Sequence, residues 1–205
     1  MEFKFSNKQI QNIKKAGLKR IPSLKNQILN KAQIIKKQMI SEFNAHPVTR
    51  EILSGPDATN LSQTLVGAKN GNLFSFIGFE SGSDPIQPIL QRLIEIEITL
   101  DKSSDSYFLN IKMPSPEEIW ELTPMPWQEG RSWAKGIESG ISGLNYYLYG
   151  SFEENSRSGT GVQTNKVRSY ARYVPIQYIT TLLKKYKTKF SSLYKKNKSI
   201  YTLVD

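Results

Sequence analysis

The chain has 205 residues, a formal net charge of +10 and a hydrophobic content of 38%. One domain, or one domain with arms, is usual at this length, and the hydrophobic content is low for a compact domain. The absence of cysteine excludes disulfides and thiolate metal sites. No apolar run approaches the ~20 residues of a membrane span, and the N-terminus lacks the apolar stretch of a signal peptide.

The charges are divided between segments of the chain. Residues 1–40 hold ten Lys and Arg against one acid, residues 161–205 again hold ten against one, and residues 41–160 hold eight against sixteen. The three segments therefore carry +9, −8 and +9. A chain with opposite charge on different segments can engage a neighbouring copy or an anionic polymer.

Long helices are predicted near both ends. Residues 1–23 are expected to form a basic N-terminal arm and residues 24–205 a single α+β domain. A helix is predicted from the capping residue Ser23 to about Phe43, and a second helix is predicted to begin at Pro175 and to continue to about residue 196. In the first helix, apolar residues four and seven positions apart form one core-facing stripe. In the second, apolar residues three and four positions apart do so, and lysines occupy the other faces of both. The stripe of the second helix consists of Ile176, Ile179, Leu183, Tyr186, Phe190 and Leu193.

Shorter elements are predicted between these helices. Pro47 opens a short helix to residue 53, residues 54–72 are a loop, and the aromatic run 73–79 is a strand weakened by Gly78. Asp84 followed by proline predicts the cap of a helix that ends near residue 94.

A β-hairpin is the clearest strand signal. Apolar residues alternate with polar ones over 94–100 and again over 107–113, on either side of a polar turn of six residues. Residues 114–133 are expected to form a structured loop with a short helix near 117–122, and a helix is expected from Trp133. Residues 144–149 and 167–174 are predicted strands joined by a polar loop. The predicted fold is α+β, with a small, mostly antiparallel four-stranded sheet, flanking N- and C-terminal helices and a protruding hairpin loop.

No catalytic template fits the sequence. There is one histidine, no phosphate-binding G-x-x-x-x-G-K-[ST] and no G-x-S-x-G. Asp84, Glu95 and Glu97 are the acids that could hold Mg²⁺ in a nuclease, but a nuclease of this kind would place a lysine two residues after a glutamate. We interpret Glu95 and Glu97 as a solvated strand face, and we predict no catalytic residue, cofactor or metal.

Two groups of residues are candidates for contacts with partners. Arg168, Tyr170 and Arg172 share one face of the predicted strand 167–174, where they could bind a nucleic-acid backbone and stack on a base. The alternative is that these arginines pair with acids of this chain or of a neighbouring subunit. In the loop between the last two strands, mixed charges suit a subunit contact. They are Glu153, Glu154 and Arg157.

Several segments occur in an order that resembles the neck proteins of tailed bacteriophages, the head–tail connector and tail-completion group. They are HPVTREIL (46–53), GNLFSFIGFESGSDPI (71–86), SRSGTGVQT (156–164), YARYVPIQYI (170–179) and the lysine-rich terminal helix. The resemblance implies a non-enzymatic virion protein, made in the host cytoplasm and assembled as a homo-oligomeric ring about the portal–tail axis. It implies neck, portal-adaptor or tail proteins as partners, DNA passing through the lumen without sequence-specific contact, and no membrane. The alternatives are a sequence-independent nucleic-acid-binding protein and a metal-dependent nuclease.

Overall fold

The computed structural model divides the chain into two compact units. Unit 1 comprises Met1–Ser41, Leu93–Pro114 and Leu182–Asp205, and unit 2 comprises Glu42–Arg92 and Ser115–Thr181. The structure describes residues 2–4, 21–66, 71–103, 106–140, 147–149, 162–164 and 172–201. Mixed helix and sheet is confirmed, so the chain belongs to the α+β class.

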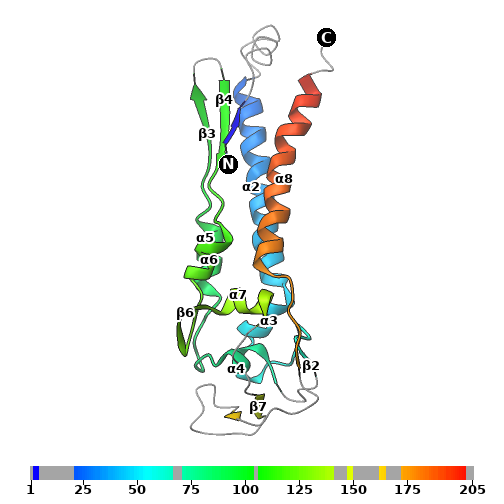
Figure 1. The fold of residues 1–205 in the computed structure, drawn as a ribbon. Coiled ribbons are helices and arrows are strands. Elements are labelled where there is room, and N and C mark those ends of the chain that lie inside the picture. Colours follow the sequence, from blue (N-terminus) through cyan, green and yellow to red (C-terminus); the bar gives the residue numbers. More distant parts are fainter. Residues whose placement is uncertain are drawn as a thin grey trace. The chain divides into compact units, whose positions relative to one another are not determined.

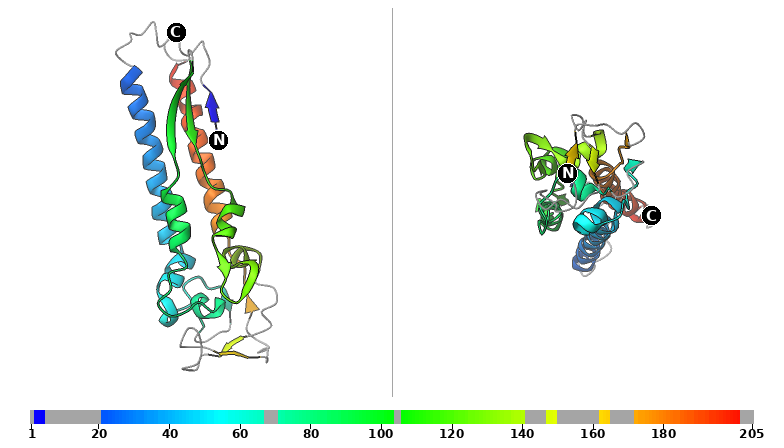
Figure 2. Two further views of the ribbon diagram at one scale, coloured as in Figure 1. Left: turned by 90° about the vertical axis from the view of Figure 1, so that its left-hand side faces the viewer. Right: turned by 90° about the horizontal axis from the view of Figure 1, so that it is seen from below.

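Unit 1 combines two long helices with a three-stranded sheet. Helix α2 (Ile21–Ala45) has its first 21 residues in this unit, and helix α8 (Ile179–Tyr201) enters it at Leu182. The sheet contains β1 (Glu2–Lys4), β3 (Ile98–Ser103) and β4 (Ser106–Ile111) in the antiparallel order β1-β4-β3. Figures 1 and 2 show the β3–β4 hairpin alongside α2 and α8.

The predicted hairpin is confirmed with a tighter turn. Ile98 pairs with Ile111 and Leu100 with Leu109, and the ladder continues to a pair between Ser103 and Ser106. The polar residues that were expected to form the turn therefore extend both strands instead. Strand β1, which lies in the predicted N-terminal arm, pairs with β4.

Both long helices bury one stripe of apolar side chains, as their spacing predicts. The same unit also buries apolar residues within the hairpin and just before it. The buried hydrophobic residues of unit 1 are Ile28, Ala32, Met39, Leu93, Ile96, Leu109, Ile111, Leu182, Leu183, Tyr186 and Phe190. Helix α8 begins four residues after Pro175, where we expected its start.

Unit 2 is built from short elements. Its helices are α3 (Pro47–Leu53), the 3-10 turn η2 (Gly55–Asp57), α4 (Leu73–Ile77), α5 (Gln87–Ile94, of which the last two residues belong to unit 1), α6 (Pro116–Glu121) and α7 (Trp133–Ser139). Its strands are β2 (Leu65–Val66), β5 (Pro124–Met125), β6 (Gln128–Ser132), β7 (Tyr147–Tyr149), β8 (Val162–Thr164) and β9 (Arg172–Tyr173). Aromatic rings form part of its core, where Phe79 packs against Phe74 and edge-on against Trp133.

The predicted four-stranded sheet is wrong. Across the described ranges, the strands of unit 2 form three separate antiparallel pairs, β2-β9, β5-β6 and β7-β8. Strand β9 pairs with β2, in a segment that we had expected to be a loop. Alternation along one strand predicts which face is buried, but it carries no information about which distant segment supplies the hydrogen-bond partner. Most of the predicted protruding loop lies outside the described residues, although 162–164 form β8.

The predicted strand at 73–79 is also wrong, because its first five residues form helix α4. Asn72 caps this helix by accepting a hydrogen bond from the Ser75 backbone at 2.9 Å, and Gly78 ends it in the left-handed conformation at a φ of 83°. A short run of consecutive apolar residues suits a buried helix as well as a buried strand. Here the residues at the two ends decide, since Asn is a preferred N-cap and Gly a preferred helix terminator.

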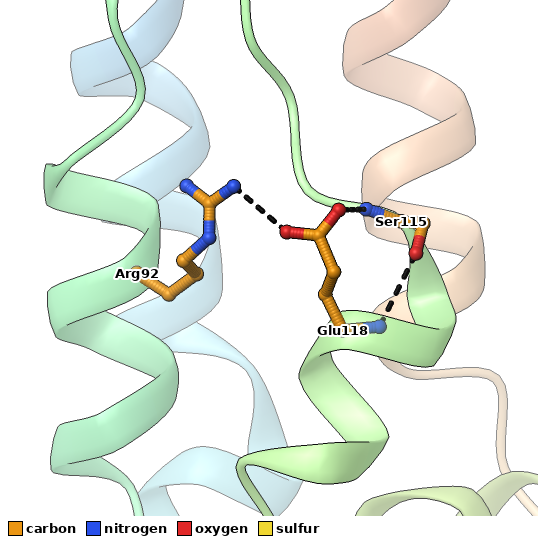
Figure 3. Close-up of polar contacts among 3 residues, drawn as sticks. All are labelled: Arg92, Ser115 and Glu118. Atoms are coloured by element: carbon orange, nitrogen blue, oxygen red, sulfur yellow. Dashed lines mark hydrogen bonds and ion pairs between the residues drawn. The ribbon is translucent and has the colours of Figure 1, made fainter.

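Ser115 and Glu118 form a capping box at the start of α6, and Glu118 also pairs with Arg92 of α5 (Figure 3). The Ser115 hydroxyl accepts from the Glu118 backbone at 3.2 Å, and one carboxylate oxygen of Glu118 accepts from the Ser115 backbone at 3.1 Å. The other oxygen pairs with the Arg92 guanidinium at 2.9 Å. The Arg92 and Ser115 hydrogen bonds hold the pKa of the Glu118 carboxyl below its usual value.

Candidate nucleic-acid interface

The two units carry opposite net charge. Unit 1 holds 19 Lys and Arg against six Asp and Glu, which gives +13, and unit 2 holds nine against twelve, which gives −3. Together they account for the +10 of the whole chain. The positive charge of the protein is therefore concentrated in the unit that contains most of both long helices.

The part of α2 that lies in unit 1 has no acidic residue from Ile21 to Ser41. Because the apolar stripe faces the core, the remaining side chains are presented outward, and Lys31 and Lys37 are exposed. Exposed amide and hydroxyl side chains accompany them on this helix. They are Asn26, Gln27, Asn30, Gln33, Gln38 and Ser41.

Helix α8 has the same composition on its outer face. It has no acid from Ile179 to Tyr201, and Leu183, Tyr186 and Phe190 are buried on its inner face. Lys184, Lys185 and Lys187 are exposed, together with Thr188 and Ser192. The Lys189 ammonium lies 4.4 Å from the centre of the Tyr186 ring, a cation–π contact that holds it close to the helix surface.

The hairpin supplies partners for several of the acids of unit 1. Glu97 forms an ion pair with Lys112 at 2.6 Å, and Asp101 accepts a hydrogen bond from Asn110 at 2.9 Å. By contrast, the four helix lysines 31, 37, 184 and 187 make no ion pair with any residue in the described ranges. We use the name lysine face for these four residues, two on the exposed side of α2 and two on the exposed side of α8.

Lys36 is on α2 but has a different role. Its ammonium donates to the backbone carbonyls of Ile94 and Ile96, at 2.5 and 2.8 Å, and burial lowers its pKa. Ile94 is the last residue of α5, where the backbone carbonyl has no partner within that helix, and a lysine side chain can satisfy such a carbonyl. Lys36 therefore fastens α2 to the end of α5 within unit 1, and it is not part of the lysine face.

The chemistry of this surface matches a phosphate backbone. Lysines neutralise phosphates, and Asn and Gln side chains donate to phosphate oxygens, whereas the Thr188 and Ser192 hydroxyls already donate to carbonyls of α8. Such contacts carry no base information, so the surface suits binding that is independent of sequence.

Five of the six contact residues that we proposed from the sequence cannot be placed in this interface. Arg168, Tyr170, Glu153, Glu154 and Arg157 lie outside the described residues. The backbone of Arg172 lies in β9, opposite Val66. The lysine face was interpreted from the sequence only as the solvated back of each helix. The signal that distinguishes it is the complete absence of Asp and Glu over residues 21–41 of α2 and over the 23 residues of α8.

The acids considered for a nuclease have other partners. One carboxylate oxygen of Asp84 accepts from the backbones of Ile86 and Gln87, both at 3.1 Å, where it caps the start of α5. Glu97 pairs with Lys112. Within the part of the chain that the structure describes, no group of three or more His, Asp or Glu side chains is arranged to hold a metal ion.

Comparison of this chain with protein-family models, with curated proteins and with solved structures gives no match. Among the helices of the described segments, none has the length and hydropathy that crossing a bilayer requires.

Proposed function

We propose that this chain is a non-enzymatic structural protein of the head–tail junction of a tailed bacteriophage, assembled as a ring about the DNA path. The observation that carries the proposal is the division of charge, +13 in unit 1 against −3 in unit 2, with two acid-free helical segments in the basic unit. The order of segments that resembles neck proteins supports it independently.

The two units have different tasks in this proposal. The lysine face of unit 1 contacts the phosphate backbone of DNA in the lumen, without reading its sequence. Packed surfaces of unit 2 hold an adjacent copy, its net acidic charge only orients the basic segments of that copy, and the same contact repeated around an axis closes into a ring. Neck, portal-adaptor and tail proteins are the further partners, in a virion that assembles in the host cytoplasm.

A second candidate function is a free, sequence-independent nucleic-acid-binding protein. The lysine face favours it equally, because a phosphate-binding surface does not depend on a ring. The two functions differ in what holds the copies together. Subunits packed through buried surfaces stay associated at high salt, whereas binding of a monomer to DNA weakens steeply because added salt reduces the free energy gained from counterion release.

Two measurements on the purified protein separate these functions. Native mass spectrometry and light scattering at low and high salt should give one closed oligomer of 23.4 kDa subunits that persists at high salt. A monomer at every concentration and salt would contradict the ring, and salt-sensitive DNA binding by that monomer would establish the second function.

The DNA contact is tested with a variant in which two lysines are neutralised. Replacing Lys184 and Lys187 with Gln should reduce the slope of log affinity against log salt by about two, close to one for each phosphate that is no longer neutralised. The matched control is Lys112→Gln, which removes an exposed lysine that is already paired with Glu97. Equal slopes for the double variant and the control would exclude the lysine face as the DNA contact.

A further inference from the structure

Strand β3 is an end strand of the three-stranded sheet of unit 1, and none of the described strands pairs with its outer edge. The hydrogen bond from the Lys112 backbone to the Glu97 carbonyl, at 3.1 Å, shows which groups form that edge. Alternate residues of an antiparallel strand bond to the partner strand, so the N–H and C=O groups of Ile98 and Leu100 point away from β4. They form a row of main-chain donors and acceptors with which a further strand can pair.

Lys36 sets the start of this open edge. Its ammonium donates at 2.8 Å to the carbonyl of Ile96, which belongs to the same outward-facing row as Ile98. The edge contains no proline, and its register on β4 is regular over all six residues of the strand. Ile98 and Leu100 are half-buried, so each keeps apolar surface that an added strand can cover.

The charges of β3 favour one antiparallel register with a second copy of the same strand. Pairing centred on Thr99 sets Glu97 opposite Asp101, and pairing centred on Asp101 sets this acid opposite itself. Pairing centred on Leu100 sets Asp101 opposite Thr99, whose hydroxyl can donate to the carboxylate. It also sets Glu97 opposite Ser103, so neither acid faces an acid. Because like charges directly opposite one another destabilise a strand pair, the register centred on Leu100 is the favoured one.

We propose that β3 pairs antiparallel with β3 of a second copy of this chain, about a two-fold axis at Leu100. Main-chain hydrogen bonds hold the two strands, and the opposed side chains set their register. The interface is isologous, because the same edge serves both copies, and it joins two three-stranded sheets into one. The proposal does not rest on the head–tail assignment, because each copy carries this edge whether or not the copies also form a ring.

Cysteine cross-linking tests the register directly, since the chain has no cysteine of its own. Thr99 and Asp101 are exposed, so Thr99→Cys and Asp101→Cys leave the buried core unchanged. Opposed residues of an antiparallel pair have Cα atoms ~4.5–5.5 Å apart, a separation that a disulfide can bridge. In an equal mixture of the two variants, with one of them labelled with ¹⁵N, intact mass spectrometry should show the mixed dimer forming faster than either homodimer.

Gln38→Cys, on the exposed side of α2, measures cross-linking by random collision. Mixed-dimer formation no faster than cross-linking of this control would exclude the pairing. Homodimers of Thr99→Cys or of Asp101→Cys that form faster than the mixed dimer would contradict the axis at Leu100.

Charge substitutions at Thr99 should change the affinity between copies in opposite directions. Thr99→Asp sets an acid opposite Asp101 on both sides of the axis, so it should weaken the step in which the mass doubles by about tenfold. Thr99→Lys sets a base at the same places and should strengthen this step by a similar factor. Gln38→Asp and Gln38→Lys make the same changes of charge on α2 and should leave the affinity close to that of the wild type. Equal affinities of Thr99→Asp and Thr99→Lys in analytical ultracentrifugation would overturn the proposal.

Discussion

Single polar side chains organise the loops of unit 2. Glu51 on α3 is fully buried, and its two carboxylate oxygens accept from the backbones of Ser62 and Leu73, at 2.6 and 2.7 Å. A buried carboxylate is costly unless hydrogen bonds satisfy it, and here each oxygen has a backbone donor. Nothing in the sequence distinguishes Glu51 from the solvated acids nearby, because its donors come from residues 11 and 22 positions away.

His46, the one histidine of the chain, caps α3. Its Nδ1 accepts from the Val48 backbone at 3.3 Å, and its ring packs against Tyr178, which is hydrogen-bonded to Thr49 at 2.7 Å. Burial lowers the pKa of His46. A hydrogen bond to the Gln177 backbone and the carboxylates of Glu42 and Glu138 act on this pKa in the opposite direction. The cap requires an unprotonated Nδ1, so the folded state favours the neutral ring.

This geometry predicts a pH dependence of stability. Below the usual histidine pKa of about 6.5, the unfolded chain takes up a proton that the folded His46 does not. The free energy of unfolding therefore decreases as the pH is lowered. This decrease in the free energy of unfolding continues until the pH reaches the lower pKa of His46 in the folded state. Asparagine also caps helices and does not titrate in this range, so His46→Asn should remove the dependence while keeping the cap.

Urea unfolding at pH 7.5 and 5.5 measures this effect. The wild type should lose more free energy of unfolding than His46→Asn, by less than the ~1.4 kcal/mol per pH unit of one full proton, because solvent screens the half-buried ring. Identical losses in the two proteins would show that the charge of His46 is not coupled to folding.

At the scale of elements, periodicity predicts the parts that are defined by local sequence. The α2 and α8 stripes and the β3–β4 hairpin follow from spacing alone, since each buries one face against the rest of unit 1. The β2–β9 pair of unit 2 does not, because its two-residue strands carry almost no alternation and come from distant segments. The irregular register beside Gly130 lies in the local β5–β6 hairpin, where the two-residue strand β5 carries too little alternation to predict it.

Helix α8 offers a direct test of its core-facing stripe. Leu183 is 5% exposed and its neighbour Lys184 is exposed. Leu183→Ala should reduce the free energy of unfolding by ~2–5 kcal/mol, because it removes buried methyl groups and leaves a cavity. Lys184→Ala, on the outer face of the same turn, should change it by no more than about 0.5 kcal/mol. Equal effects of the two substitutions in chemical denaturation would show that the stripe is placed wrongly.

At the scale of the whole molecule, the fold distributes the charged segments of the chain between two units. The two basic ends of the chain both enter unit 1, together with the acidic hairpin segment 93–114, and the net charge of that unit is still +13. The net charges of the three sequence segments predict that the two ends of the chain are basic and its middle acidic. They do not predict the lysine face, because that requires knowing that both helices enter one unit and which acids are paired within the hairpin.

The central claim, a place at the head–tail junction, is tested most directly by locating the chain in a virion. Particles that contain this protein would be labelled with a Fab fragment raised against the folded chain and viewed by electron cryo-microscopy. The account predicts label at one position on each particle, between the head and the tail. Label distributed over the head or along the tail, or absent from intact and partly disassembled particles alike, would contradict it.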